Sequence, residues 1–388
     1  MTNRVPVILG VADAPLEKGR LRGGGTVLSA QAKVARTALA EAGATLADVD
    51  GLFTAGVWGL PGPGTMPTLA LSEYLGISPR HSDSSNIGGA AFESHAAHAA
   101  RAIAAGDCDV ALIVYGSTQR SDISRSLGGN DPILMSQYET PYGLPRPIGG
   151  YALAAARHMY QYGTTSEELA EIAVAARAWA ALNPAASYST PLSVDDVLSS
   201  GLISDPLHKL DCCLVTDGAG AVVMTTEEHA RGAGRVPVYL RGWGESQTHL
   251  SIASMPDLTV VPAARSGRDA FAMAGIGPGD IDVAELYDSF TVTVLLTLEA
   301  LGFCAPGEGG KFVSNGRISP GGEFPLNTSG GGLSYAHPGM FGIFLLIEAV
   351  RQLRGEAGQR QIPDARIALV NGSGGVLSSA STAILATS

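Results

Sequence analysis

The sequence predicts a layered α/β fold made of two similar halves. Of its 388 residues, 45% are hydrophobic and 16% are charged, so the chain carries enough apolar surface to bury large cores. Its 50 glycines, many alanines and few aromatic residues favour helices that pack closely on sheets. Two segments of the chain also match each other, which indicates an internal duplication.

The duplicated unit begins with an alanine-rich helix. Residues 31–42 and 263–274 are both predicted to be helical. Each helix ends at an Ala-Gly pair, and glycine is the residue that most often follows the last turn of a helix. Ala42 aligns with Ala274, and the same offset holds over the turn and the Asp-Val-Asp or Asp-Ile-Asp stretch that follow.

The match extends into a second pair of segments. A glycine-rich approach, a long helix and an apolar strand occupy residues 88–115 and again 337–371. The strands, at 110–115 and 367–370, are continuous apolar runs, which are typical of strands covered on both faces. Each half is therefore expected to be one mixed sheet between helices.

The expected halves cover residues 1–230 and 235–388. Residues 118–205 have no counterpart in the second copy, and an unmatched insertion of this length usually forms a cap over a site or a subunit contact. Within it, residues 166–181 are predicted to form a helix, because hydroxyl side chains and acids stand at its start.

Charge and hydropathy exclude several classes of function. The formal net charge is −11, and Lys and Arg are scattered, so a nucleic-acid partner is not expected. No window reaches the roughly 20 apolar residues that a membrane span requires. The short apolar run after Arg4 favours a first strand over a signal peptide. We therefore expect a cytoplasmic protein.

The spacing of cysteine and histidine does not indicate a metal site. The four cysteines, at 108, 212, 213 and 304, fit neither a zinc site nor a disulfide framework. His95 and His98 lie one helical turn apart, but no cluster of carboxylates or thiols accompanies them. We therefore expect no metal.

Two further segments complete a family resemblance. Residues 212–221, CCLVTDGAGA, close the first half, and residues 330–339, GGGLSYAHPG, lie in the second. With the duplication and the insertion, they make the whole chain resemble the thiolase superfamily, in particular the sterol-carrier-protein type thiolases. The resemblance implies the thiolase fold, with two pseudo-repeated mixed-sheet halves in five αβαβα layers. It also implies a coenzyme A thioester as substrate and no covalently bound cofactor.

The catalytic elements of that family are retained only in part. The acyl-accepting cysteine at the start of the central helix falls on Gly89, and Tyr287 replaces the Asn or His that binds the thioester oxygen. The histidine of the Gly-His-Pro motif is retained as His337, although Ala336 replaces the glycine. The second cysteine falls on residue 371 or 372, an asparagine and a glycine. Both cysteines of acyl transfer are therefore absent.

What remains can stabilise an enolate. Without a nucleophile no acyl-enzyme forms, but His337 and the backbone N–H groups at Gly89 and Gly374 can still bind a thioester oxyanion. An enolate without acyl transfer indicates retro-aldol cleavage of a β-hydroxyacyl-CoA. Tyr287 and Tyr335 are the expected proton carriers beside His337, and which of the three acts as the base stays open.

The expected substrate-binding residues are Asn86, Ser334 and Asn371. Two other functions remain open: a degenerate acyltransferase of the acetyl-CoA acetyltransferase kind, and a non-catalytic acyl-CoA or lipid-binding protein. An exposed sheet edge in the first half predicts a homodimer. The resemblance also implies a small OB-fold acyl-CoA-binding partner. The sequence does not identify the acyl chain.

Overall fold

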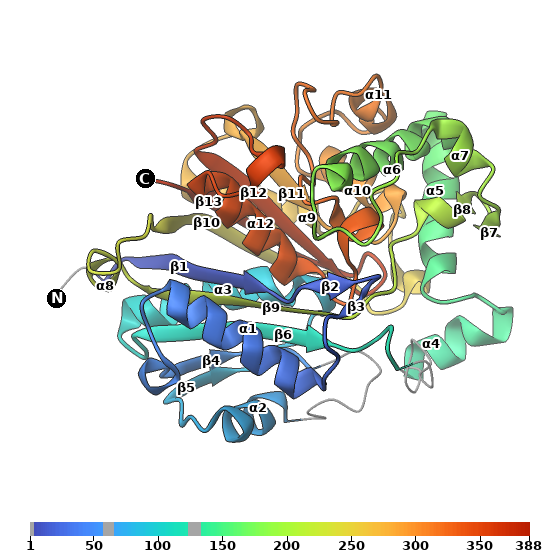
Figure 1. Cartoon of the computed structure of the whole chain (residues 1–388). Helices are drawn as coiled ribbons and strands as arrows, with labels where there is room; N and C mark the ends of the chain where they lie inside the picture. The colour runs from blue at the N-terminus through green and yellow to red at the C-terminus, as the bar shows by residue number, and fades with distance from the viewer. Residues whose placement is uncertain (1–3, 57–65, 123–132) are drawn as a thin grey trace.

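The computed structural model describes residues 4–56, 66–122 and 133–388 (Figure 1). A 9-stranded sheet has the order β11-β12-β13-β10-β1-β9-β6-β4-β5. Its strands are β1 (Pro6–Asp13), β4 (Gly51–Phe53), β5 (His81–Asp83), β6 (Val110–Ser117), β9 (Gly218–Thr226), β10 (Val238–Gln247), β11 (Val283–Leu286), β12 (Ile367–Gly374) and β13 (Ser379–Ala386). Two short ladders pair β2 (Leu16–Glu17) with β3 (Arg20–Leu21), and β7 (Leu202–Ser204) with β8 (Leu207–His208).

The α-helices of the described residues surround this sheet. They are α1 (Val27–Glu41), α2 (Pro67–Leu75), α3 (Ala91–Ala105), α4 (Ile133–Tyr138), α5 (Ile148–Tyr162), α6 (Ser166–Ala181), α7 (Val194–Leu198), α8 (Glu227–Ala230), α9 (Ala263–Ala274), α10 (Thr291–Ala300), α11 (Gly309–Val313) and α12 (Gly342–Arg354). No helix in this part of the chain is both long and apolar enough to cross a membrane.

The sheet confirms the predicted duplication. The order β1-β9-β6-β4 in the first half is repeated as β10-β13-β12-β11 in the second. In both, the first two pairings are antiparallel and the third is parallel. The two halves meet where β1 pairs with β10, at Val7 opposite Tyr239 and Ile8 opposite Val238. Among the described residues, the extra edge strand β5 occurs in the first half and has no counterpart in the second.

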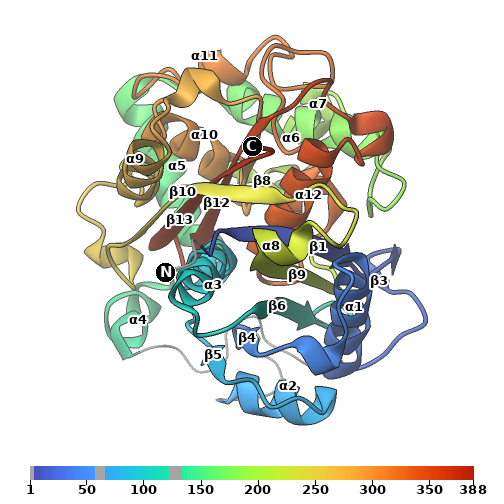
Figure 2. The same cartoon turned by 90° about the vertical axis from the view of Figure 1, so that its left-hand side faces the viewer.

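Helices cover the outer face of each half and fill the centre between the two halves. Helix α1 packs on β1, β9 and β6, whereas α9 packs on β10 and β13. Helices α3 and α12 contact each other and strands of both halves, so they form the shared central layer. In Figure 2, α1 and α3 flank the strands of the first half from opposite sides. One buried apolar cluster accordingly contains Phe92 of α3, Leu346 of α12 and strand residues of both halves.

The insertion packs against the second half. Helices α5 and α6 contact α10, and their apolar residues share a core with it. Helix α6 has the predicted bounds and begins after Thr165, whose hydroxyl accepts a hydrogen bond from Glu168 N at 3.3 Å. Tyr151 of α5 reaches across to donate to the carbonyl of Gly375 at 2.9 Å. Residues 123–132 of the predicted insertion lie outside the described residues.

Two details differ from the predicted elements. Helix α1 begins four residues earlier than the alanine pattern predicts, because Thr26 caps it and accepts from Ser29 N at 3.2 Å. The family pattern places Cys212 and Cys213 at the start of a buried strand, which is wrong: β9 begins only at Gly218. The two cysteines lie in the segment before it, where Cys213 N donates to Ser289 O at 2.9 Å.

Candidate active site

The centre of the site is a contact between Tyr287 and Gly89. Tyr287 follows β11, and its N–H donates to the carbonyl of Asn371 at 2.9 Å, which fixes the end of that strand. Its ring lies where a side chain at position 89 would project, because a Cβ built on Gly89 would stand 2.5 Å from Tyr287 Cζ. The carbonyl oxygen of Ser373 stands 2.5 Å from the same Cβ. The ring and this carbonyl together require glycine at position 89, and the phenol lies in the space of the missing nucleophile.

Tyr287 forms a hydrogen-bonded pair with His337. Its hydroxyl lies 2.9 Å from His337 Nε2, and the two rings meet edge to face. Burial lowers the pKa of His337 to about 4 and raises the pKa of Tyr287 well above its usual value. At neutral pH both groups are thus uncharged, so the phenol donates to Nε2 and the imidazole is the group able to take up a proton.

Asp288 positions the segment that carries His337. Residues Gly331–Tyr335 form a π-helical turn, in which the N–H groups of Gly332 and Leu333 donate to the Asp288 carboxylate at 2.6 and 3.1 Å. His337 N in turn donates to Thr216 Oγ1 at 3.0 Å. These contacts hold His337 in place beside Tyr287.

The start of α3 supplies backbone donors next to the pair. Gly88–Ala90 form a 3₁₀ turn that continues into α3, and the first N–H groups of a helix have no partner within it. Gly88 has a φ of 71° and abuts Gly374, where a Cβ on Gly88 would stand 2.7 Å from Gly374 Cα. This close approach requires glycine at both positions. It brings together the two predicted oxyanion donors, Gly89 and Gly374.

Two of the predicted residues have other contacts. The Tyr335 hydroxyl donates to Asp13, which also forms an ion pair with Arg351 at 2.5 Å. Ser334 is buried and accepts from Arg177 Nε at 2.9 Å. Neither hydroxyl is directed at His337 by a described hydrogen bond, so the structure does not bring them into the Tyr287–His337 pair.

The two predicted asparagines also make local contacts. Asn86 is exposed and accepts from Gly88 N at 3.1 Å, so it shapes the turn before α3. The Asn371 amide donates to Thr382 at 2.7 Å, and Thr382 is hydrogen-bonded to Ser266 of α9. Because α9 covers the outer face of the second half, the side chain of Asn371 points away from the central layer.

Gly372 is therefore the residue that faces the site, since successive residues of a strand point to opposite faces. A Cβ on Gly372 would stand 2.8 Å from Ala90 Cα and 2.7 Å from Glu93 Cδ. The sequence left open whether Asn371 or Gly372 occupies the second cysteine position. The alternation of side chains along β12 favours Gly372. The Glu93 carboxyl fills the space beside this glycine.

Sequence reasoning missed Glu93. It lies on α3 four residues after Gly89, so the two share one helix face, and it is 0% exposed. Burial raises the pKa of Glu93 to about 8. The available signal was a single acid within an alanine-rich helix, which sequence patterns usually assign to a solvent-facing position.

Cysteine does not supply a substitute nucleophile in the described residues. Burial raises the pKa of the Cys213 thiol, and the neighbouring Asp288 carboxylate raises it further. Burial also raises the pKa of Cys212 to about 12, and its thiol donates to His208 O at 3.3 Å. These groups remain thiols at neutral pH. No set of three or more His, Cys, Asp or Glu side chains suited to a metal occurs in the described ranges.

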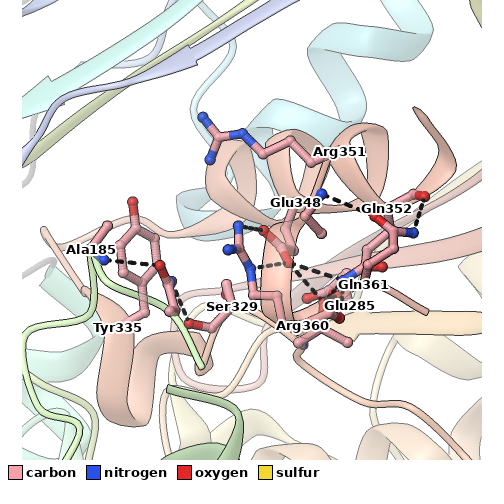
Figure 3. Close-up of polar contacts among 12 residues, drawn as sticks. Ala185, Glu285, Ser329, Tyr335, Glu348, Arg351, Gln352, Arg360 and Gln361 are labelled. Carbon is pink, nitrogen blue, oxygen red and sulfur yellow. Dashed lines mark hydrogen bonds and ion pairs between the residues drawn. The ribbon is translucent and has the colours of Figure 1, made fainter. Parts of the chain in front are cut away.

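A second buried polar cluster is formed by residues of β11, α12 and the segments next to them (Figure 3). Arg360 donates to both oxygens of Glu348, at 2.7 and 2.9 Å. Thr328 Oγ1 lies 2.7 Å from Glu285 Oε1 and 2.9 Å from Glu348 Oε1. Burial and the neighbouring Glu348 raise the pKa of Glu285 well above its usual value. The cluster ties the strand that leads to Tyr287 onto the central layer.

Comparison of the sequence and the fold with known proteins identifies a family. Residues 244–387 match the family model "Thiolase C-terminal domain-like". The chain is 36% identical over 366 residues to a 17-hydroxy-3-oxo-4-pregnene-20-carboxyl-CoA lyase of Mycobacterium tuberculosis, covering 89% of this chain and 90% of that protein. The chain belongs to the thiolase superfamily.

Two further members of the superfamily differ in their named chemistry. An acetyl-CoA acetyltransferase of Methanothermobacter thermautotrophicus is 36% identical over 276 residues, 71% of this chain and 72% of that protein. A solved structure named "Ltp2-ChsH2(DUF35) aldolase" superimposes with a TM-score of 0.88 at 31% identity, covering 98% of this chain and 97% of that chain. The predicted thiolase fold and the likeness to acyl-CoA aldolases are confirmed.

Proposed function

We propose that this protein is a thiolase-like lyase that cleaves the Cα–Cβ bond of a β-hydroxyacyl-CoA. The observation that carries the proposal is the Tyr287 phenol, which lies in the space beside Gly89 and is hydrogen-bonded to His337. A thiolase needs a thiolate in that space to hold the acyl group. A phenol–imidazole pair moves protons instead, which is what a retro-aldol reaction needs.

The proposed reaction begins at the β-hydroxyl group. Tyr287 accepts the hydroxyl proton while it passes its own proton to His337 Nε2, 2.9 Å away. The Cα–Cβ bond then breaks, which gives a ketone or aldehyde and the enolate of a shorter acyl-CoA. The N–H groups at Gly89 and Gly374 stabilise the enolate oxygen, and one such donor typically contributes about 10²–10³-fold in rate.

The relatives support this chemistry. One is named a lyase of a steroid carboxyl-CoA and another an aldolase. The name of the aldolase includes a second component, ChsH2(DUF35). We propose that this chain likewise works with a small OB-fold acyl-CoA-binding protein, and that it forms a homodimer through the edge strand β5. We also propose that it acts in the cytoplasm, with coenzyme A present only as part of the substrate.

One observation favours a second candidate, acyl transfer: the acetyltransferase relative is as similar in sequence as the lyase, at 36% identity. The two functions are distinguished by incubating the protein with acetyl-CoA. Acyl transfer releases free coenzyme A thiol and leaves an acyl adduct on the protein, which intact mass spectrometry detects. A lyase gives neither.

The lyase is tested with a panel of β-hydroxyacyl-CoA esters that includes ring-bearing chains, with and without an OB-fold partner protein. We expect a carbonyl product and a shortened acyl-CoA in equal amounts, and no adduct. The Tyr287→Phe variant serves as the inactive control. Formation of an acyl adduct together with absence of carbonyl product would overturn the proposal.

A further inference from the structure

Glu93 is a buried acid that the proposed reaction does not yet use. Its side chain is 0% exposed, and neither carboxyl oxygen has a hydrogen-bond partner among the described residues. Leaving a buried polar group unpaired lowers the stability of a fold. A carboxyl at this position therefore does not serve the fold.

The carboxyl lies at the junction of the elements that build the site. A Cβ on Gly342, the first residue of α12, would stand 2.7 Å from Glu93 Oε2 and would overlap the carbonyl of Gly89. On the opposite side, Gly372 of β12 leaves the space that Glu93 Cδ occupies. Asn371, which precedes Gly372, is the residue that binds Tyr287 N. The carboxyl is thus one helical turn from the oxyanion donor and next to the strand that holds the phenol.

Gly89 and Gly372 have similar surroundings. Both face the central layer without a side chain, and each space is filled by an ionisable group from elsewhere on the chain: the phenol of Tyr287 at Gly89, and the carboxyl of Glu93 at Gly372. The groups that enclose Glu93, namely Ala90, Gly342 and Gly372, are uncharged. The carboxyl is therefore protonated at neutral pH, in agreement with the effect of its burial.

A retro-aldol reaction has two proton transfers, one from the β-hydroxyl oxygen and one to Cα of the enolate. The Tyr287–His337 pair receives the first proton, and the enolate must then take a proton at Cα. We infer that Glu93 donates this proton. The inference rests on the proposed function for the cleavage step. By microscopic reversibility, the fraction of Glu93 that is ionised takes a proton from Cα of an acyl-CoA that is not cleaved, so the same group catalyses proton exchange there.

The step is balanced in protons. The electron pair of the enolate takes the proton from the Glu93 O–H, so a Cα–H bond forms, the O–H bond breaks and the thioester carbonyl is restored. Glu93 is left as a carboxylate and His337 as an imidazolium. His337 releases its proton to solvent and Glu93 takes one up after the products leave, so the substrate gains as many protons as it loses.

The test follows proton exchange without carbon–carbon cleavage. The protein is incubated with propionyl-CoA in D₂O, and deuterium at Cα is measured by mass spectrometry. We expect exchange with the wild type, and a loss of about 10²-fold or more in Glu93→Gln, which keeps the shape but cannot transfer a proton. Glu285→Gln is the matched control, because it neutralises another buried acid of raised pKa that has its own partner, Thr328. Exchange should continue in that control.

The outcomes separate the inference from the proposed function. If Glu93→Gln exchanges as fast as the wild type, or if the wild type does not exchange, Glu93 is not the proton donor. If exchange depends on Glu93 but no β-hydroxyacyl-CoA is cleaved, the lyase proposal fails and the role of Glu93 stands. Thermal unfolding checks that Glu93→Gln folds. Glu93→Asp, whose carboxyl is withdrawn by one methylene, should keep only part of the exchange rate.

Discussion

Two buried polar clusters of the second half differ in whether they contain a charged pair. In the cluster around Glu348, the carboxylate receives two bonds from Arg360, and Thr328 links it to Glu285 (Figure 3). At the site, Tyr287 and His337 share one hydrogen bond and no opposite charge is bonded to either. A charged pair such as Glu348–Arg360 holds elements together, whereas groups that burial keeps neutral have protons available for transfer.

The strongest test of this contrast is to remove the neutral Tyr287–His337 pair. Tyr287→Phe and His337→Gln should each lower the rate of cleavage by about 10²–10⁴-fold, because each interrupts the proton path. Both should leave the melting temperature close to that of the wild type, because the pair contributes one neutral hydrogen bond. Steady-state kinetics beside thermal unfolding measures both effects. A variant that loses stability but not rate would assign the pair to structure.

The paired cluster should respond in the opposite way. Glu348→Gln leaves the buried Arg360 without its counter-ion, and we expect the free energy of unfolding to fall by about 3–5 kcal/mol. Protein that remains folded should keep most of its activity per molecule. Chemical denaturation together with activity corrected for the folded fraction provides the measurement. A large loss of rate at unchanged stability contradicts the structural role.

Restoring a cysteine at position 89 tests whether Tyr287 occupies the space of the nucleophile. Gly89→Cys should not create a thiolase, because its Cβ would stand 2.5 Å from Tyr287 Cζ. Overpacking of this kind typically costs about 1–3 kcal/mol of stability, and displacement of the phenol should abolish cleavage. In the double variant Gly89→Cys/Tyr287→Ala the clash with the ring is relieved, and only the carbonyl oxygen of Ser373, 2.5 Å from the same Cβ, still has to shift. Intact mass spectrometry after acetyl-CoA treatment then shows whether an acyl adduct forms; an adduct in the single variant contradicts the steric argument.

These contrasts also show what the sequence could predict. Gly89, Tyr287 and His337 were identified because each lies at a fixed place in a motif, in register with the duplication. The fold followed from the repeated helix and strand patterns, which depend on local residues. Local patterns and motif positions do not give the direction of a side chain in an irregular segment.

Tyr335 illustrates the limit. Its neighbours in the motif predict a place in the site, but the π-helical turn carries its hydroxyl to Asp13, at the far end of the sequence. Asn371 and Gly372 could not be separated for a related reason, since the phase of the pleat depends on pairing with β13. The position of Glu93 depends on two glycines from distant segments, Gly342 and Gly372.

Tyr335→Phe is therefore informative. The Tyr335 hydroxyl donates to the carboxylate of Asp13, and a hydrogen bond to a charged group is typically worth about 1.5–3 kcal/mol. We expect a stability loss in that range and a much smaller effect on rate than Tyr287→Phe. Parallel kinetics of the two variants makes the comparison. An equal loss of rate in both would restore Tyr335 to the catalytic group.

The smallest expected effect is on the pH dependence of stability. Because burial lowers the pKa of His337 to about 4, the unfolded chain binds more protons than the folded one between about pH 4 and 6.5. This histidine thus has no proton-linked effect on stability above about pH 6.5 and destabilises the fold as the pH falls through the window, by about 1.4 kcal/mol per pH unit at most. Denaturation of wild type and His337→Gln across the window should show a steeper decline in the wild type. Parallel curves would contradict the burial effect.

The shared central layer has a consequence for the duplicated chain as a whole. Helices α3 and α12 each come from one half, yet each is covered by strands of both. A fragment that ends between the halves would leave one of these helices with an apolar face open to water, so neither repeat is self-sufficient. The two copies can diverge in sequence, but they must continue to fold together as one cooperative unit.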